Sequence, residues 1–183
     1  MEHPLLQFRY CPKCGSNHFS IHNEKSKKCM ACGFTYYFNP SSATVAFILN
    51  KESELLVCKR AKNPAKDTLD LPGGFVDMNE TAEEAISREV FEETGLSMQN
   101  ATYLFSLPNI YVYSDFSVHT LDSFFLCQVE KTDILKAMDD VADSFFIPLK
   151  EIEPTKFGLD SVRKGVIRFL KLLNSDSTTI KVG

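Results

Sequence analysis

Apolar residues recur along this chain with two different periods, which predict helices in two segments and strands in five. Helical spacing, with apolar residues at every third or fourth position, predicts α-helices over residues 82–94 and 159–173. Densely apolar or alternating stretches that are rich in β-branched and aromatic residues predict strands. These stretches cover residues 43–50, 54–60, 100–116, 120–130 and 144–147. Residues 133–138 and 148–153 are interpreted as short helices or turns.

The helix predicted over residues 82–94 has clear end signals. Thr81 and Glu84 match a capping box, and Gly95 is a C-cap signal. At roughly 100° per residue, Glu89 and Glu93 fall on the apolar stripe of this helix. That stripe consists of Ala82, Ala85, Ile86 and Val90. We therefore expect the two carboxylates to point inward.

Glu89 and Glu93 are poorly placed for an isolated helix. Carboxylates at i and i+4 repel each other, and acids in the last turn oppose the helix dipole, each costing from a few tenths to about 1 kcal/mol. Arg88 is expected to pair with Glu84 and Glu92, so Glu89 and Glu93 would have no cation in helical reach. A divalent metal is the simplest partner, and Mg²⁺ or Mn²⁺ suits hard oxygen ligands, phosphate groups and water activation. The alternative, a solvated acidic face, would place the acids opposite the apolar stripe.

Residues 74–96 read G-x5-E-x7-R-E-U-x-E-E-x-G-U, where U is an apolar residue. The fixed positions are Gly74, Glu80, Arg88, Glu89, Val90, Glu92, Glu93, Gly95 and Leu96. This pattern is the signature of the Nudix hydrolases, which the chain therefore resembles. The resemblance implies an α/β/α sandwich with a mixed sheet, in which the motif forms a loop, a helix and a loop beneath the active site. The helix at 159–173 would close the sandwich.

The resemblance also implies roles for individual residues. The Mg²⁺ or Mn²⁺ ligands would be Glu89, Glu92, Glu93 and the carbonyl of Gly73, which lies in a tight loop that can approach a ligand closely. Glu92 and Glu93 would also act in catalysis, Arg88 would orient the carboxylates, and Glu80 would support the loop or an outer metal. In many Nudix enzymes a carboxylate outside the motif is the general base or a further ligand. The candidates here are Asp139, Asp140 and Asp143, with solvated turn acids as the alternative.

Four cysteines near the N-terminus form two C-x2-C-G motifs. They are Cys11, Cys14, Cys29 and Cys32, and fourteen residues separate the two motifs. Four thiolates suit tetrahedral zinc, and the glycines let the backbone fold back around the metal. We interpret residues 1–38 as a zinc ribbon, with a disulfide pair or a redox motif as the alternative.

Charge is distributed unevenly along the 183 residues, whose net charge is −4. Residues 1–40 hold five basic and two acidic side chains, so they carry +3 and the remainder carries −7. Lys25, Lys27 and Lys28 could contact phosphate or RNA, but a folding module with solvated lysines is the simpler reading. No apolar run in the sequence is long enough to span a membrane, and no signal peptide is apparent. We therefore expect a cytoplasmic protein.

A second resemblance lies after the first motif, at Ser106 to Ser114. The NADH pyrophosphatase branch of the Nudix family has S-Q-P-W-P-F-P-x-S there, and this chain has S-L-P-N-I-Y-V-Y-S. The serines and Pro108 match, and Tyr111 keeps an aromatic ring, whereas Asn109 replaces tryptophan and two prolines are lost. The residues expected to bind substrate are Ser106, Pro108, Tyr111 and Phe75. The alternative for aromatic residues in a strand is a place in the core.

We therefore expect a Nudix domain over residues 39–173 and a flexible tail over 174–183. The expected activity is hydrolysis of a nucleoside diphosphate linked to another group, such as NADH, NAD⁺ or ADP-ribose, with release of AMP. One alternative is an enzyme that acts on NAD-capped or modified RNA 5′ ends, and another is a nucleotide-sensing module without catalysis. A homodimer is expected only by analogy with the NADH pyrophosphatase branch.

Overall fold

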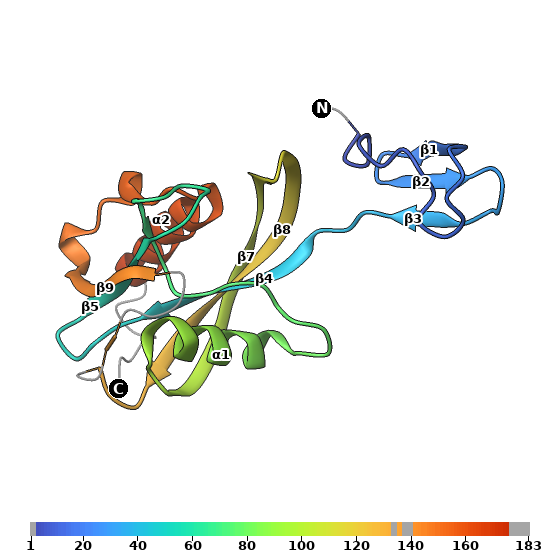
Figure 1. Cartoon of the computed structure of the whole chain (residues 1–183). Helices are drawn as coiled ribbons and strands as arrows, with labels where there is room; N and C mark the ends of the chain where they lie inside the picture. The colour runs from blue at the N-terminus through green and yellow to red at the C-terminus, as the bar shows by residue number, and fades with distance from the viewer. Residues whose placement is uncertain (1–2, 133–134, 137–140, 176–183) are drawn as a thin grey trace. The chain divides into compact units, whose positions relative to one another are not determined.

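The computed structural model describes residues 3–132, 135–136 and 141–175 (Figure 1). The chain divides into two compact units, Met1–Pro40 and Ser41–Gly183. Within the described residues, no helix combines the length and the apolar character that a membrane span requires.

The first unit is a small antiparallel sheet with two cysteine-bearing loops. Its strands are β1 (Phe19–Asn23), β2 (Ser26–Cys29) and β3 (Thr35–Tyr37), with β2 in the centre. Cys11, Phe19 and Cys29 are buried together, with Phe34 packed against them. An apolar cluster this small supplies little burial energy, which makes a bound metal a useful stabiliser.

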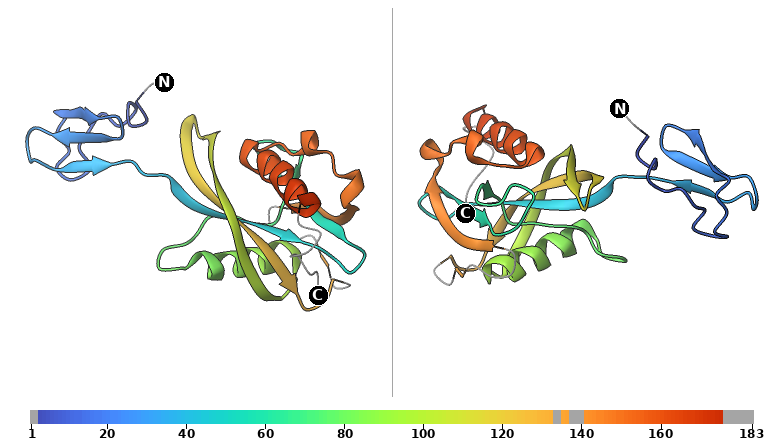
Figure 2. Two further views of the ribbon diagram at one scale, coloured as in Figure 1. Left: turned by 180° about the vertical axis from the view of Figure 1, so that it is seen from behind. Right: turned by 45° about the horizontal axis from the view of Figure 1, so that its top comes forward.

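The second unit contains two three-stranded sheets and two α-helices (Figures 1 and 2). Its strands are β4 (Ser41–Ile48), β5 (Glu54–Arg60), β6 (Leu69–Asp70), β7 (Met98–Tyr113), β8 (Phe116–Val129) and β9 (Val141–Pro148). The α-helices are α1 (Ala82–Thr94) and α2 (Asp160–Ser175), and two short 3₁₀ turns, η1 (Leu149–Glu151) and η2 (Pro154–Lys156), precede α2. One sheet has the order β4-β8-β7, with β4 parallel to β8 and β7 antiparallel to it, and the other has the order β6-β5-β9. The mixed sheet and the α/β/α class expected from the sequence are confirmed.

Strand β4 is covered on both faces of the β4-β8-β7 sheet, because α1 and α2 lie on opposite sides of it (Figures 1 and 2). In β4, Val45 and Phe47 belong to the core cluster that contains α2, whereas Ala46 and Ile48 belong to the cluster that contains α1. Successive side chains of a strand point to opposite faces, so a strand covered on both sides has a continuous apolar run. This accounts for the sequence Val-Ala-Phe-Ile at residues 45–48.

Helix α2 packs closely on the sheet at Gly165. A Cβ atom at this position would lie 2.4 Å from Cε1 of Phe124, a ring that is fully buried. Phe47 stacks on Phe169 of the same helix with ring centroids 4.0 Å apart. Glycine inside a helix costs roughly 1 kcal/mol relative to alanine, and this close approach of helix to sheet is its structural reason.

The elements lie close to the predicted ones, with differences at their ends. Helix α1 has the predicted bounds, its capping box is formed, and Gly95 has φ 70° as the C-cap. The sequence did not predict β6 or η2, which are only two and three residues long. Residues 133–134, 137–140 and 176–183 lie outside the described residues, so most of the turn predicted at 133–138 and most of the predicted tail cannot be compared. Residues 174–175 belong to α2 rather than to a tail.

Candidate active site

The loop before α1 is held against β4 by backbone hydrogen bonds. Amides of β4 donate to the carbonyls of Pro72 and Gly74, both at 2.8 Å, and Phe75 pairs with Ala43. Gly73 has φ 148°, and a Cβ atom there would lie 2.1 Å from the carbonyl oxygen of Thr44. A side chain is therefore excluded at Gly73, and the loop can lie directly on the strand.

Gly74 keeps the loop close to the acids of α1. A Cβ atom at Gly74 would lie 2.5 Å from Oε1 of Glu89, so this glycine allows a carboxylate against the loop backbone. Glu93 lies one turn further along the helix, and its Oε2 accepts a hydrogen bond from the Gly73 amide at 3.0 Å. The two inward acids of the helix are thus each set by one glycine of the loop.

Arg88 organises the remaining acids of the motif. Its guanidinium donates to both carboxylate oxygens of Glu80 at 2.9 Å, to Glu89 at 2.8 Å, to Glu92 at 3.0 Å and to the carbonyl of Phe75 at 3.0 Å. These bonds lower the pKa of Glu80 to about 2, with help from the Asp77 amide. Arg88 therefore links the helix, the loop and three carboxylates.

Two pairings expected from the sequence are wrong. Glu84 does not pair with Arg88, because its carboxylate accepts from the Thr81 amide at 2.8 Å in the capping box. Glu89 does have a cationic partner, because the guanidinium of Arg88, the preceding residue, lies 2.8 Å from its carboxylate. Residues at i and i+1 do not normally face each other on a helix, so helical spacing alone missed this contact.

Glu93 is a partly buried acid of the cluster whose ionisation is shifted. Burial raises its pKa to about 8, and the Asp70 and Glu89 carboxylates raise it as well, while the Gly73 amide and Arg60 act in the opposite direction. Burial also raises the pKa of Glu89, against the lowering effect of Arg88. Buried acids that share too little positive charge are suited to a divalent cation.

Asp70 and Arg60 form a second charged pair beside Glu93. The guanidinium of Arg60 donates to the carboxylate of Asp70, and both side chains are largely shielded from solvent. Burial raises the pKa of Asp70, and the Arg60 charge lowers it. Sequence reasoning did not select either residue, because they lie outside the motif and only the pairing of β5 with β6 brings them together.

These groups open into one cavity of about 560 Å³. Its lining includes Gly73, Gly74, Phe75, Arg88, Glu89, Glu92 and Glu93 of the motif region. Arg60, Asp70, Asn109, Tyr113, Thr120 and Asp122 contribute further polar groups, and Val45, Leu71, Leu159 and Val162 contribute apolar walls. A cavity lined by both acidic and apolar side chains is suited to a ligand that joins a charged group to a flat one.

The predicted substrate residues are not all brought to this cavity. Phe75 lines it, but Ser106 and Pro108 of β7 are absent from its described lining. Tyr111 lies in β7 opposite Val118, and its side chain is outside what the structure describes. Among the predicted bases, Asp143 is exposed in β9 and accepts from the Ser144 amide at 2.9 Å, whereas Asp139 and Asp140 lie outside the described residues.

The described residues fit a divalent cation at the acid cluster in their donor chemistry. Glu89, Glu92, Glu93 and Gly73 provide oxygen donors around one recess, although their carboxylate oxygens are not gathered within 4.8 Å of one another as the cysteine sulfurs are. Arg88 holds Glu89 and Glu92. An ion that used those two carboxylates would therefore compete with Arg88 for them.

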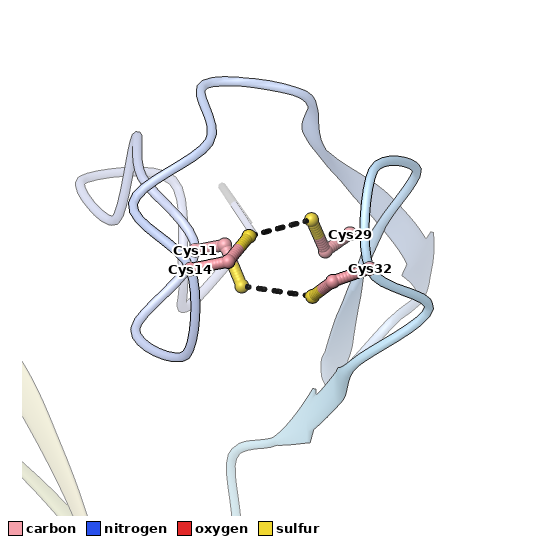
Figure 3. Close-up of side chains that lie close together, drawn as sticks. All are labelled: Cys11, Cys14, Cys29 and Cys32. Atoms are coloured by element: carbon pink, nitrogen blue, oxygen red, sulfur yellow. Dashed lines mark hydrogen bonds between the residues drawn. The ribbon is translucent and has the colours of Figure 1, made fainter.

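The four cysteines of the first unit form a compact cluster (Figure 3). All four sulfur atoms lie within 4.8 Å of one another, with Cys11 Sγ 3.8 Å from Cys32 Sγ and Cys14 Sγ 3.7 Å from Cys29 Sγ. A tetrahedral site with Zn–S bonds of about 2.3 Å places sulfur atoms about 3.8 Å apart. Gly15 and Gly33 have φ 72° and 75°, and their backbone amides close the two loops by donating hydrogen bonds to the carbonyls of Cys11 and Cys29. The cluster thus has the dimensions of a zinc site.

Comparison with known proteins agrees with the class of enzyme that the loop, the acidic helix and the cavity define. Residues 39–169 match the family model described as the NUDIX domain. The chain belongs to the Nudix family, and its named relatives are hydrolases.

Two curated relatives illustrate the range of that similarity. The chain is 32% identical over 160 residues to the NAD-capped RNA hydrolase NudC of Haemophilus influenzae (strain ATCC 51907 / DSM 11121 / KW20 / Rd), an alignment that covers 85% of this chain and 58% of the relative. It is 33% identical over 138 residues to the ADP-ribose pyrophosphatase of Methanocaldococcus jannaschii, covering 74% of this chain and 78% of the relative. The chain thus corresponds to little more than half the length of that NudC protein.

The fold is shared with a crystal structure of a NUDIX hydrolase from Nitrosomonas europaea. The TM-score is 0.71 at 20% identity, and the match covers 91% of this chain and 93% of that one. At this identity the match shows the fold alone.

Proposed function

We propose that this protein is a Mg²⁺- or Mn²⁺-dependent pyrophosphohydrolase that cleaves a nucleoside diphosphate linked to another group and releases AMP. NADH, NAD⁺ and ADP-ribose are the proposed substrates. The observation that carries the proposal is Glu93, a partly buried acid fixed by the Gly73 amide at 3.0 Å beside Glu89 in one cavity. The similarity to an ADP-ribose pyrophosphatase and to NudC supports the choice of substrates.

Each residue of the cluster has a distinct task in this proposal. Glu89, Glu92, Glu93 and the Gly73 carbonyl hold the cation. When bound, the cation neutralises phosphate oxygens and makes water a better nucleophile. Glu93 must be ionised to bind it, and the Gly73 amide keeps the carboxylate oriented as the proton leaves. Arg88 sets the positions of Glu89 and Glu92, and Glu80 anchors Arg88. One of the motif glutamates or an aspartate outside the motif orients the attacking water.

The test is AMP release from NADH, NAD⁺, ADP-ribose, FAD and diadenosine polyphosphates in Mg²⁺, with Glu93→Gln as the inactive control. We expect turnover to fall by orders of magnitude in Glu93→Gln while the fold is kept. Glu83→Gln is the matched control, because Glu83 is an exposed residue of the same helix outside the cavity lining. Near-normal turnover in Glu93→Gln would refute the assignment.

A second candidate function is hydrolysis of NAD-capped RNA 5′ ends, which the similarity to NudC favours. The same acids would act, and the exposed Lys25 and Lys28 of the first unit would contact the RNA backbone. Lys27, also considered from the sequence, is buried and donates to the Phe8 carbonyl at 2.6 Å, so it is not available for this contact. In that case RNA binding weakens steeply as salt concentration rises. If capped RNA is not preferred over free NAD⁺ at low salt, this candidate fails.

Zn²⁺ is the structural metal that we propose is bound by the thiolates of Cys11, Cys14, Cys29 and Cys32. One zinc ion per chain by elemental analysis of the purified protein is the expected result. The sensing alternative predicts nucleotide binding without turnover, whereas the motif here is complete. A homodimer also stays a proposal, to be measured by sedimentation.

A further inference from the structure

Asn109 of β7 is a polar residue with little exposure to bulk solvent. It is 6% exposed and lines the cavity. No hydrogen bond joins its carboxamide to any other group in the described part of the chain. A carboxamide has two N–H donors and an acceptor oxygen, and none of these atoms of Asn109 is both fully buried and unpaired, so the groups without a protein partner are open to the cavity. The side chain is therefore suited to bind a ligand in the cavity.

A fixed carboxylate accompanies Asn109. Asp122 is 5% exposed, and one of its oxygens accepts from the hydroxyl of Thr120 while the other accepts from the hydroxyl of Ser161 in α2. Each carboxylate oxygen keeps a lone pair after these bonds. Asp122 is thus a rigid acceptor that can take a further donor from the cavity.

Strand register places these groups on one face. Asn109 of β7 pairs with Thr120 of β8, and Asp122 lies two residues further along the same strand. The intervening Leu121 and the neighbouring Ile110 are exposed, at 47% and 51%, so the side chains alternate as expected for a strand. The cluster of Asn109, Thr120 and Asp122 therefore faces the cavity together.

This cluster lies at a suitable distance from the acid cluster. The loop at Phe75 pairs with β4, β4 pairs with β8, and β8 pairs with β7, so three strand spacings separate the loop from Asn109. At about 4.8 Å each, they amount to about 14 Å. A nucleoside diphosphate can span a separation of this size, with its phosphates at the loop, where the Gly73 amide binds Glu93, and its base at Asn109. Leu159 and Val162, also in the cavity lining, offer apolar contact to a flat ring.

We propose that Asn109 and Asp122 recognise the nucleobase of the substrate, through an exocyclic amine beside a ring nitrogen. The amine donates to the Asn109 carbonyl and to the Asp122 carboxylate, and the Asn109 amide donates to the ring nitrogen, a pairing that asparagine makes with adenine. Adenine and cytosine have this edge. Hypoxanthine has a carbonyl in place of the amine, which would face the carboxylate of Asp122. This inference rests on the proposed function, whose product is AMP.

The experiment measures base preference instead of activity alone. Binding of AMP, CMP and IMP is measured by calorimetry, and kcat/KM is measured for ADP-ribose and its hypoxanthine analogue. We expect a tenfold or greater preference for AMP over IMP in the wild-type protein, and a loss of at least fivefold of that preference in Asn109→Leu. Asp122→Asn should bind IMP better than the wild type does, because the new amide donates to the hypoxanthine carbonyl. If CMP also binds more tightly than IMP, the site selects any base with an exocyclic amine; if only AMP does, the site selects adenine.

Ile110→Ala is the matched control, since Ile110 is the exposed neighbour on the opposite face of β7. Its preference should equal that of the wild type. A ratio unchanged within twofold in both Asn109→Leu and Asp122→Asn overturns the base site, even if ADP-ribose is cleaved. If AMP binds with the expected preferences but no diphosphate is hydrolysed, the base site stands and the proposed activity fails. If neither AMP nor CMP binds better than IMP, the base site fails.

Discussion

The pKa of Glu93 makes the stability of the metal-free protein dependent on pH. The carboxyl pKa is raised from 4.5 to about 8 in the folded protein. An acid with a raised pKa stabilises the fold fully below its unfolded value, and this contribution is lost as pH rises through the folded value. Between about pH 4.5 and pH 8 the metal-free protein should therefore lose stability, by at most about 5 kcal/mol from this group at 1.36 kcal/mol per pKa unit.

The assay is urea unfolding of the chelator-treated protein from pH 5 to 9, with Glu93→Gln alongside. Glutamine is neutral throughout, so the free energy of unfolding of the wild type minus that of the variant should fall as pH rises and level off above the folded pKa. Mg²⁺ binding removes the proton, so apparent Mg²⁺ affinity should increase over the same pH range. If this stability difference is flat between pH 5 and 9, the burial argument for Glu93 is refuted.

Three further predictions concern the glycines and the cysteine cluster. Gly165→Ala should lower the free energy of unfolding by about 1–3 kcal/mol in urea, because its Cβ would lie 2.4 Å from Phe124, and a stabilised variant would contradict this packing. Gly74→Ala should lower kcat for ADP-ribose at least tenfold while thermal unfolding shows a folded protein, because the new Cβ displaces the Glu89 carboxylate, and unchanged kcat would show that Glu89 has room to move. Removing zinc with a chelator should let trypsin cleave after Lys27, whose side chain is 6% exposed and donates to the Phe8 carbonyl, while cleavage within the second unit stays unchanged. Equal protection with and without chelator would argue against a structural metal.

The sequence by itself determined the features that depend on near neighbours. The ends of α1 follow from Thr81, Glu84 and Gly95, which form its caps within the segment itself. The cysteine spacing also predicts the cluster, because each pair lies in one tight loop. The motif acids were found in the same way, since Glu89 and Glu93 stand one helical turn apart.

Only the tertiary structure decided which distant residues join those acids. Asp122 is the one acidic residue of β8, a signal that the sequence does contain, yet its partner Ser161 is 39 residues away. Asn109 was visible only as a departure from a motif, and its place in the cavity depends on the register between β7 and β8. Strand pairing and helix docking depend on packing over the whole domain, so local spacing cannot specify them.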